Sequence, residues 1–192
     1  MDPDLPLLEA LVAGEDLALN ELIRRHQAAL FSFAFRYLRD ATAAHDVVQE
    51  CFVRLYFKAA SFKPGSTVKT WLYTIATNLC RDRLRWLGRR RNDVALDAPT
   101  VAGNGKTRVE AADTSPLPSE QTAQADRFEV LQRAIDLLPH NLRLAVVLCS
   151  LEGKTHQEAA EILGTTPKTI ELRIYHAKAK LRELLAHNLA KE

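Results

Sequence analysis

Along most of the chain, apolar residues recur three and four positions apart, which is the spacing of one face of an α-helix. Three such stripes are Val47, Cys51 and Leu55; Leu72, Ile75 and Leu79; and Ile170, Ile174, Ala177 and Leu181. No run of alternating β-branched residues predicts a β-sheet. The pattern therefore predicts an all-α protein.

In the N-terminal half, this periodicity predicts helices over about Leu5–Ala13, Asp16–Arg39, Thr42–Ala60 and Val68–Arg91. The sequence KPGS at 63–66 separates the last two, because Pro, Gly and Ser favour turns. We expect these helices to form one small domain, residues 1–91.

The pattern stops at residues 92–124, which contain three prolines, two glycines and no aromatic residue. Five acidic and two basic side chains give this segment a local net charge of −3. Its apolar area is too small to offset the entropy cost of ordering the chain. We interpret it as a flexible acidic linker to a second helical domain, residues 125–192.

The second domain contains the start and stop signals of two closely spaced helices. Thr155 and Glu158 have the spacing of a capping box. Gly164 suits the left-handed position after a helix, and Thr166 followed by Pro167 suits the start of the next helix. This order is typical of the helix–turn–helix motif, whose second helix enters the DNA major groove. It also fits a plain helical hairpin with a charged, solvated face.

If the motif binds DNA, the stripe that begins at Ile170 faces the core and leaves basic side chains on the other faces of the second helix. Those able to contact phosphates are Arg173, Lys178, Lys180 and Arg182. Base recognition then falls to side chains near the start of this helix.

The predicted helix over Val68–Arg91 and the loop before it combine flat rings with positive charge. Six arginines lie within residues 81–91. The upstream aromatic residues are Phe62, Trp71 and Tyr73. One helix face carries Asn78, Arg81, Asp82 and Arg85. Rings that stack on bases, beside arginines that meet phosphates, suit unpaired DNA. The alternative is that Trp71 and Tyr73 are core residues and the arginines form a solvated helix end. We expect at least one of the aromatic residues to belong to the core.

Composition excludes several other classes. The formal net charge is only +2, so the distribution of charge decides more than its sum. No stretch approaches the roughly 18 uninterrupted apolar residues of a membrane span, and the N-terminus lacks the pattern of a signal peptide. We therefore expect a cytoplasmic protein without a membrane span.

No catalytic or metal-binding motif is apparent. Cys51, Cys80 and Cys149 are too far apart for a zinc-binding pair, and we interpret them as small buried hydrophobic residues. The chain lacks a phosphate-binding Gly loop, H-E-x-x-H and G-x-S-x-G. We expect no metal, no cofactor and no enzymatic activity.

Four stretches together resemble the extracytoplasmic-function (ECF) group of sigma-70-type sigma factors, the promoter-recognition subunits of bacterial RNA polymerase. They are AAHDVVQECFVRLY (43–56), FKPGSTVKTWLYTIATNLCRDRLR (62–85), LPHNLRLAVVLCSLEGKTHQEAAEILG (138–164) and TPKTIELRIYHAKAKLRELL (166–185). The resemblance covers almost the whole chain apart from the linker. It implies a sigma region 2 at 1–91 and a sigma region 4 at 125–192.

The resemblance also implies partners and sites. Docking on the clamp helices of the polymerase's largest subunit would use Asp46, Gln49 and Glu50. Opening of the −10 element, with a flipped base held in a pocket, would use Phe62, Lys63, Trp71, Asn78, Arg81 and Arg85. Reading of the −35 element, with region 4 near the polymerase flap, would use Lys168, Thr169, Glu171, Leu172, Arg173, His176 and Lys178. An anti-sigma factor is the further expected partner.

Some positions depart from the commonest pattern of the group. Glu171 and Leu172 follow Ile170, and His176 stands where Arg is frequent. Glu can accept from cytosine N4 and Leu can contact a thymine methyl group, so a −35 sequence cannot be transferred from a relative. The competing interpretation is an autonomous helix–turn–helix regulator, which reads two half-sites as a dimer and needs neither the Asp46 face nor the basic helix.

Overall fold

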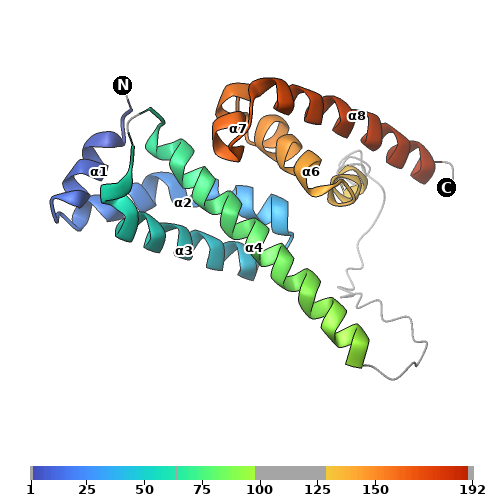
Figure 1. Ribbon diagram of the computed structural model, residues 1–192, viewed down its shortest axis with the longest axis horizontal. Coiled ribbons are helices and arrows are strands. Elements are labelled where there is room, and N and C mark those ends of the chain that lie inside the picture. Colours follow the sequence, from blue (N-terminus) through green and yellow to red (C-terminus); the bar gives the residue numbers. More distant parts are fainter. Residues whose placement is uncertain (1, 64, 98–128, 190–192) are drawn as a thin grey trace, which may run out of the picture.

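The computed structural model describes residues 2–63, 65–97 and 129–189 of the chain. Within these ranges the secondary structure is helical, and no β-strand occurs. The helices form an N-terminal and a C-terminal domain (Figure 1). The predicted all-α class with two helical domains is therefore confirmed.

The N-terminal domain consists of α1 (Leu5–Val12), α2 (Leu17–Leu38), α3 (Ala41–Lys58), a short 3₁₀ turn η1 (Ala59–Ser61) and α4 (Val68–Asp97). Helix α2 packs against each of the other three helices, and α3 packs against α4. The side chains fully buried between them include Leu22, Leu30, Phe33, Leu55 and Leu72. Burial of these large apolar side chains stabilises the bundle.

The connection from α2 to α3 shows how local sequence sets the bundle geometry. Arg39 ends α2 in the left-handed conformation, with φ of 60°. Asp40 then caps α3, because its carboxylate accepts a hydrogen bond from the amide of Ala43 at 2.9 Å. Such a cap satisfies an amide that has no partner within the helix. The two helices therefore reverse direction within a very short connection.

Helix α4 is longer than the sequence pattern predicts. We expected it to end at Arg91, but it continues to Asp97. The first proline after Val68 is Pro99, so no residue with a fixed, helix-breaking backbone interrupts the helix before that point. The helix therefore includes residues 92–97, which we had placed at the start of the linker. The rest of the expected linker and the first residues of the expected C-terminal domain lie outside the described residues.

The C-terminal domain contains a helical segment at 129–136, α6 (His140–Val146), a π-helical turn η2 (Val147–Leu151), α7 (His156–Leu163) and α8 (Pro167–Leu189). Both halves of the predicted capping box form: Glu158 N–H donates to the Thr155 hydroxyl at 3.1 Å, and Thr155 N–H donates to the Glu158 carboxylate at 2.8 Å. Gly164 adopts the left-handed conformation, with φ of 60°. The predicted helix–turn–helix is thus confirmed as a structure, whereas the π turn was not predicted.

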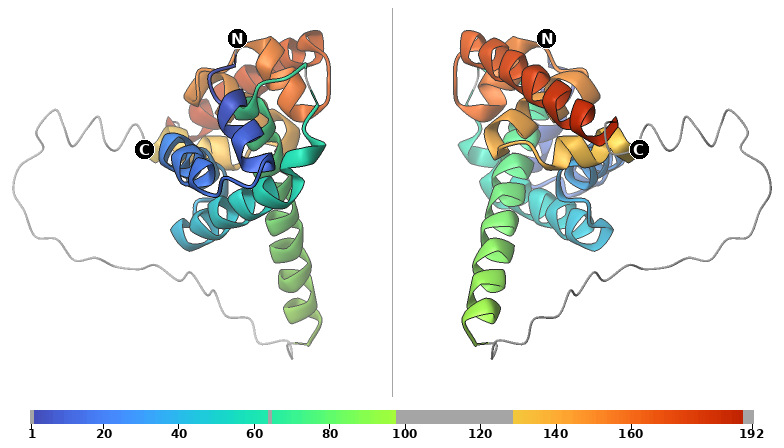
Figure 2. Two further views of the ribbon diagram at one scale, coloured as in Figure 1. Left: turned by 90° about the vertical axis from the view of Figure 1, so that its left-hand side faces the viewer. Right: turned by 90° about the vertical axis from the view of Figure 1, so that its right-hand side faces the viewer.

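The two domains pack against each other. Helix α7 lies against α4, and the π turn lies against α2. The C-terminal domain therefore covers one side of α4, while α2 and α3 cover other sides (Figures 1 and 2). The sequence did not predict whether the domains would be packed together or apart.

Candidate functional surfaces

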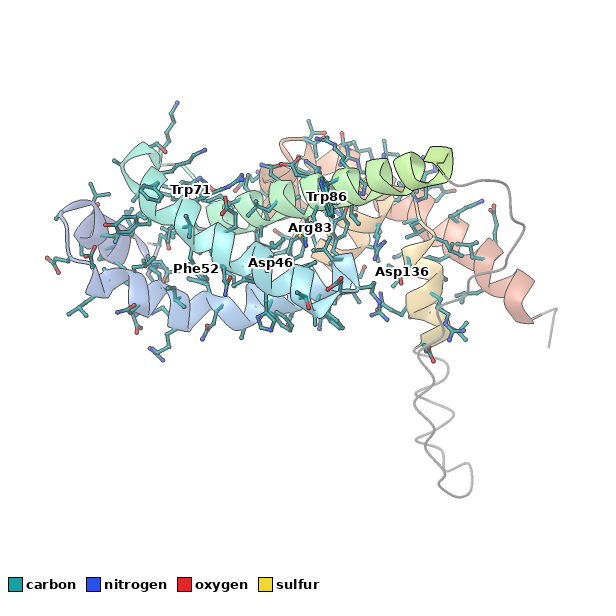
Figure 3. The ribbon with its side chains drawn as sticks, turned by 90° about the horizontal axis from the view of Figure 1, so that it is seen from below. Asp46, Phe52, Trp71, Arg83, Trp86 and Asp136 are labelled. Atoms are coloured by element: carbon teal, nitrogen blue, oxygen red, sulfur yellow. The ribbon has the colours of Figure 1, made fainter. Side chains whose placement is uncertain are left out.

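The first candidate surface is the acidic face of α3. Asp46 and Gln49 are exposed and Glu50 is partly exposed, while Val47 and Cys51 on the other side of the helix are buried. Asp46 of α3 pairs with Arg83 of α4 at 3.3 Å, where the two helices pack together (Figure 3). Glu50 pairs with Arg54 at 2.8 Å. The structure thus brings the three predicted docking residues together on one open face.

Next to this face lies an apolar groove of about 650 Å³ between α2 and α3. Gln49 belongs to both surfaces, since it also lines the groove. The groove's apolar lining includes Leu19, Ile23, Phe52, Val53, Tyr56 and Phe57. Val53, Tyr56 and Phe57 are exposed, and Phe57 has 78% of its surface open to water.

The sequence analysis missed this groove. The signal was present, because α3 carries apolar residues on more sides than the single stripe of Val47, Cys51 and Leu55. Contiguous exposed apolar surface on a folded protein marks a site of interaction. The groove and the acidic face therefore meet at Gln49.

The second candidate surface is the loop before α4 and the first turns of that helix. The rings of Phe62 and Trp71 lie 5.4 Å apart, inclined at 53°. They line a pocket of about 410 Å³ together with Lys63, Ser66, Thr70 and Thr74. Tyr73, in contrast, is buried with only 3% of its surface exposed, which confirms that one of the three aromatic residues belongs to the core.

Asn78 does not line this pocket. It is exposed and lies one helical turn beyond Thr74 on the same face of α4. Arg81 is half-buried and Arg85 is exposed, with Arg85 paired to Asp82 at 3.3 Å. The predicted −10 residues within α4 therefore share one face of the helix, with the pocket of Phe62 and Trp71 at one end and the arginines at the other.

The third candidate surface is the outer face of α8. Lys168, Glu171, Leu172, His176 and Lys178 are exposed, and Arg173 is half-buried. Lys168 pairs with Glu171 at 2.9 Å and lowers the pKa of that carboxyl. The inward stripe is as predicted, since Ile170, Ile174 and Ala177 are buried.

Two further residues of α8 belong to this surface or border it. The amide of Thr169 donates to the Thr166 hydroxyl at 3.2 Å, and the two hydroxyls lie 2.9 Å apart, so Thr169 takes part in capping the helix. Tyr175 is 68% exposed, and its ring meets that of His176 edge-on, at 5.6 Å between centroids.

Within the described residues, no helix combines the length and the apolar composition needed to cross a membrane.

Comparison with known families finds two matches in the chain. Residues 22–90 match Sigma-70 region 2, and residues 128–181 match Sigma-70 region 4. The first match spans α3 and most of α4, and the second spans the helix–turn–helix.

Several curated sigma factors are similar along most of the chain. ECF RNA polymerase sigma factor SigM of Mycobacterium tuberculosis H37Rv is 31% identical over 189 residues, which cover 96% of this chain and 85% of that protein. ECF RNA polymerase sigma-E factor of Escherichia coli K12 is 33% identical, over 91% of this chain and 90% of that protein. SigE of Mycolicibacterium smegmatis is 34% identical over 87% of this chain, but the match spans only 61% of that longer protein.

Two solved structures extend the similarity to three dimensions. CnrH, solved in complex with the cytosolic domain of CnrY, has a TM-score of 0.69 at 26% identity and covers 97% of this chain and 99% of its own. The sigma factor RpoE of Bartonella quintana, solved with the anti-sigma factor NepR, has a TM-score of 0.63 at 25% identity and covers 87% and 96%.

Proposed function

The chain belongs to the sigma-70 family, in the ECF group of sigma factors that direct RNA polymerase to specific promoters, and on this premise we propose a function for each of its three candidate surfaces. The N-terminal domain, in which residues 22–90 match Sigma-70 region 2, serves as region 2, and the C-terminal domain, in which residues 128–181 match Sigma-70 region 4, serves as region 4. Region 2 binds polymerase and opens the −10 element, while region 4 reads the −35 element.

Polymerase docking falls to α3. The apolar groove offers an exposed surface into which a helix of the polymerase clamp can pack its apolar side. Asp46 and Glu50, on the neighbouring acidic face, can meet basic side chains of the polymerase, which favours one orientation of the complex. The position of Gln49, which lines the groove and belongs to the acidic face, is the observation that carries the proposal.

We assign strand opening to the face of α4 that begins at the pocket lined by Phe62 and Trp71. Phe62 and Trp71 provide apolar walls against which a base pulled from the stack can pack, and Lys63 supplies a positive charge at the rim. Asn78 lies further along to hydrogen-bond a base edge, with Arg81 and Arg85 beyond it for the phosphates.

Reading of the −35 element falls to α8, whose first turns carry Lys168, Glu171 and Leu172 on an exposed face. Glu171 can accept from cytosine and Leu172 can contact a thymine methyl group. Arg173 and Lys178 are placed for phosphates, and the other side of region 4 would face the polymerase flap.

Two further proposals follow from family membership. An anti-sigma factor regulates the chain, which is supported by the similarity to RpoE, a sigma factor solved with NepR. Sigma factors are non-catalytic regulatory proteins, so we assign the chemistry of transcription to the polymerase and no reaction to this chain. Its place of action would be the cytoplasm, with the polymerase and the chromosome.

Reconstituted transcription tests the proposal. Core bacterial RNA polymerase, the protein and a pool of genomic promoter fragments are combined, and the 5′ ends of the transcripts are sequenced. We expect defined starts only when the protein is present, and their upstream sequences give both promoter elements.

The double variant Asp46→Arg with Glu50→Arg should lose these starts and bind core polymerase more weakly. A control with the same change of charge, Glu9→Arg with Glu129→Arg, alters exposed side chains that do not line the groove and should transcribe normally. If the polymerase makes no transcripts and the protein alone binds duplex fragments tightly, the protein is instead an autonomous helix–turn–helix regulator.

A further inference from the structure

The connection between η1 and α4, residues 62–67, carries part of the pocket lined by Phe62 and Trp71, here called the base pocket. Phe62, Lys63 and Ser66 of this connection line it, while Trp71 belongs to α4. Connections of this kind are more mobile than the helices that they join. The shape of the base pocket therefore depends on what holds the two ends of the connection.

The N-terminal segment of the chain holds the end at α4. One carboxylate oxygen of Asp2 accepts a hydrogen bond from the amide of Val68 at 2.7 Å, and the other accepts from the amide of Asp4 at 3.1 Å. Val68 is the first residue of α4, where amides have no partner within the helix. The negative charge of Asp2 also suits the positive end of the helix dipole. Asp2 thus fixes the start of the helix that bears Trp71.

The same segment holds the end of the connection at η1. Helix α1 packs against η1, and Figure 1 shows α1 and the start of α4 at the same end of the bundle. Leu5 and Leu8 of α1 line an apolar pocket of about 410 Å³ together with Phe62. Because Phe62 also lines the base pocket, this one ring borders both pockets. A shift of α1 would therefore move a wall of the base pocket.

Asp4 fastens the N-terminal segment to α2, a helix that does not line the base pocket. The side chain of Asp4 is only 6% exposed, and it pairs with His26 at 2.8 Å and with Arg25 at 3.0 Å. A buried carboxylate is tolerated where partners of this kind compensate the loss of water. The segment is thus fixed at Asp4 and contacts both ends of the connection from there, through Asp2 and through α1.

We propose that the N-terminal segment, Asp2–Leu8, holds the base pocket in the shape that receives a base, with Asp2 and Asp4 as positioning residues for opening of the −10 element. The role in opening rests on the function proposed above for this pocket, whereas the coupling of the segment to the pocket does not. Pulling a base from the stack is itself unfavourable. A pocket that has its shape before the base arrives loses less entropy on binding and makes the step easier.

A helix cap can also stabilise a fold without any effect on a binding site, and Asp40 provides the comparison. Its carboxylate accepts a hydrogen bond from the amide of Ala43 at 2.9 Å, so it caps α3 as Asp2 caps α4. Asp40 does not line the base pocket. Asp40→Ala therefore removes a cap of the same kind at a place with no contact to the pocket.

The first measurement reports the pocket in the free, full-length protein. The chain has two tryptophans, so Trp86→Phe leaves Trp71 as the only one. Acrylamide quenching of its fluorescence measures how accessible the half-buried ring of Trp71 is. In this background, Asp2→Ala and Asp4→Ala should each raise the quenching constant about twofold, because the connection beside Trp71 opens to solvent more often. Circular dichroism checks that the variants remain helical.

Two further variants separate positioning from a general loss of stability. Asp2→Asn keeps an oxygen that can accept from the amide of Val68, so its quenching should stay close to that of the parent. Asp40→Ala should leave the quenching unchanged although it loses a helix cap. Asp4 is buried, whereas Asp2 is partly exposed, so Asp2→Ala decides the test if Asp4→Ala does not fold.

The second measurement counts open complexes with core polymerase at saturating protein, by permanganate reactivity of unpaired thymines, with both tryptophans in place. Asp2→Ala should lower the number of open complexes severalfold without weakening the binding of core polymerase. Asp2→Asn should recover most of this loss, and Asp40→Ala should open the promoter as the wild type does.

Unchanged quenching of Trp71 in folded Asp2→Ala would overturn the proposal. An equal loss of open complexes in Asp40→Ala and Asp2→Ala would also overturn it, because stability alone would then explain the effect. Raised quenching with normal opening would leave the coupling in place and remove the role in opening. If even the wild type opens no promoter, the proposed function fails, while the quenching still decides whether the N-terminal segment shapes the pocket.

Discussion

The carboxylate of Asp2 accepts a hydrogen bond from the backbone amide of Val68 at 2.7 Å, across 66 positions of sequence. Val68 is the first residue of α4, so a residue near the N-terminus caps the helix that carries the proposed −10 surface. Asp4 anchors the same segment, since it pairs with His26 at 2.8 Å and with Arg25 at 3.0 Å on α2. The N-terminal segment therefore ties the start of α4 to the rest of the bundle.

Replacing Asp2 by Ala should lower the free energy of unfolding by about 1 kcal/mol, because the amide of Val68 loses its partner. Urea denaturation followed by circular dichroism measures this change. Asp16→Ala is the matched control, since Asp16 occupies the cap position of α2 without a side-chain hydrogen bond to the helix. Equal losses in the two variants would show that the Asp2 contact contributes nothing specific.

Asn78→Ala should impair promoter opening while leaving the affinity for core polymerase unchanged. Asn78 is exposed on the face of α4 that we propose binds the promoter strand, so the variant should lose the proposed base contact and no packing. We expect a roughly tenfold drop in open complexes, equivalent to about 1.4 kcal/mol, measured by permanganate reactivity of unpaired thymines. Asn141→Ala, an exposed residue of α6, is the control. A parallel loss of polymerase binding would contradict the placement of Asn78 on the strand-binding face.

Phe57→Ser should weaken binding to core polymerase about tenfold without destabilising the chain. Phe57 lines the groove beside α3 and is 78% exposed, so the free protein loses little packing while the complex loses a buried ring. Leu137→Ser removes an apolar side chain of comparable exposure, 66%, from the C-terminal domain. If both variants bind polymerase as the wild type does, the groove is not part of the interface.

The contacts that could be predicted from the sequence join residues close together in the chain, whereas the contacts that were missed join residues far apart. The capping box of Thr155 and Glu158 and the left-handed Gly164 were predicted, because their partners lie within one helical turn. The bond from Asp2 to Val68 and the pairing of Arg36 with Glu152 join residues far apart in sequence, and no local pattern encodes them. The same holds for the candidate surfaces. The residues of the acidic face were implied by the family resemblance of a short stretch of sequence, whereas the groove depends on how α2 lies against α3.

The stability of the protein should fall steeply above pH 9. Burial raises the pKa of the Cys51 and Cys80 thiols from 9.0 to about 12. The folded state therefore keeps these protons at a pH where the unfolded chain releases them. Their contribution is fully present below pH 9 and is lost as the pH rises towards 12, on the order of 1 kcal/mol per pH unit for each thiol.

Urea denaturation at pH 8 and pH 10.5 measures this loss. Cys51→Ala and Cys80→Ala should each flatten the dependence on pH, whatever they do to stability at pH 8. Cys149→Ala should flatten it less, because Cys149 is only half-buried. A residual slope should remain, since burial also raises the pKa values of Tyr37 and Tyr73. An equal slope in the wild type and in both buried-cysteine variants would show that these thiols do not carry the alkaline instability.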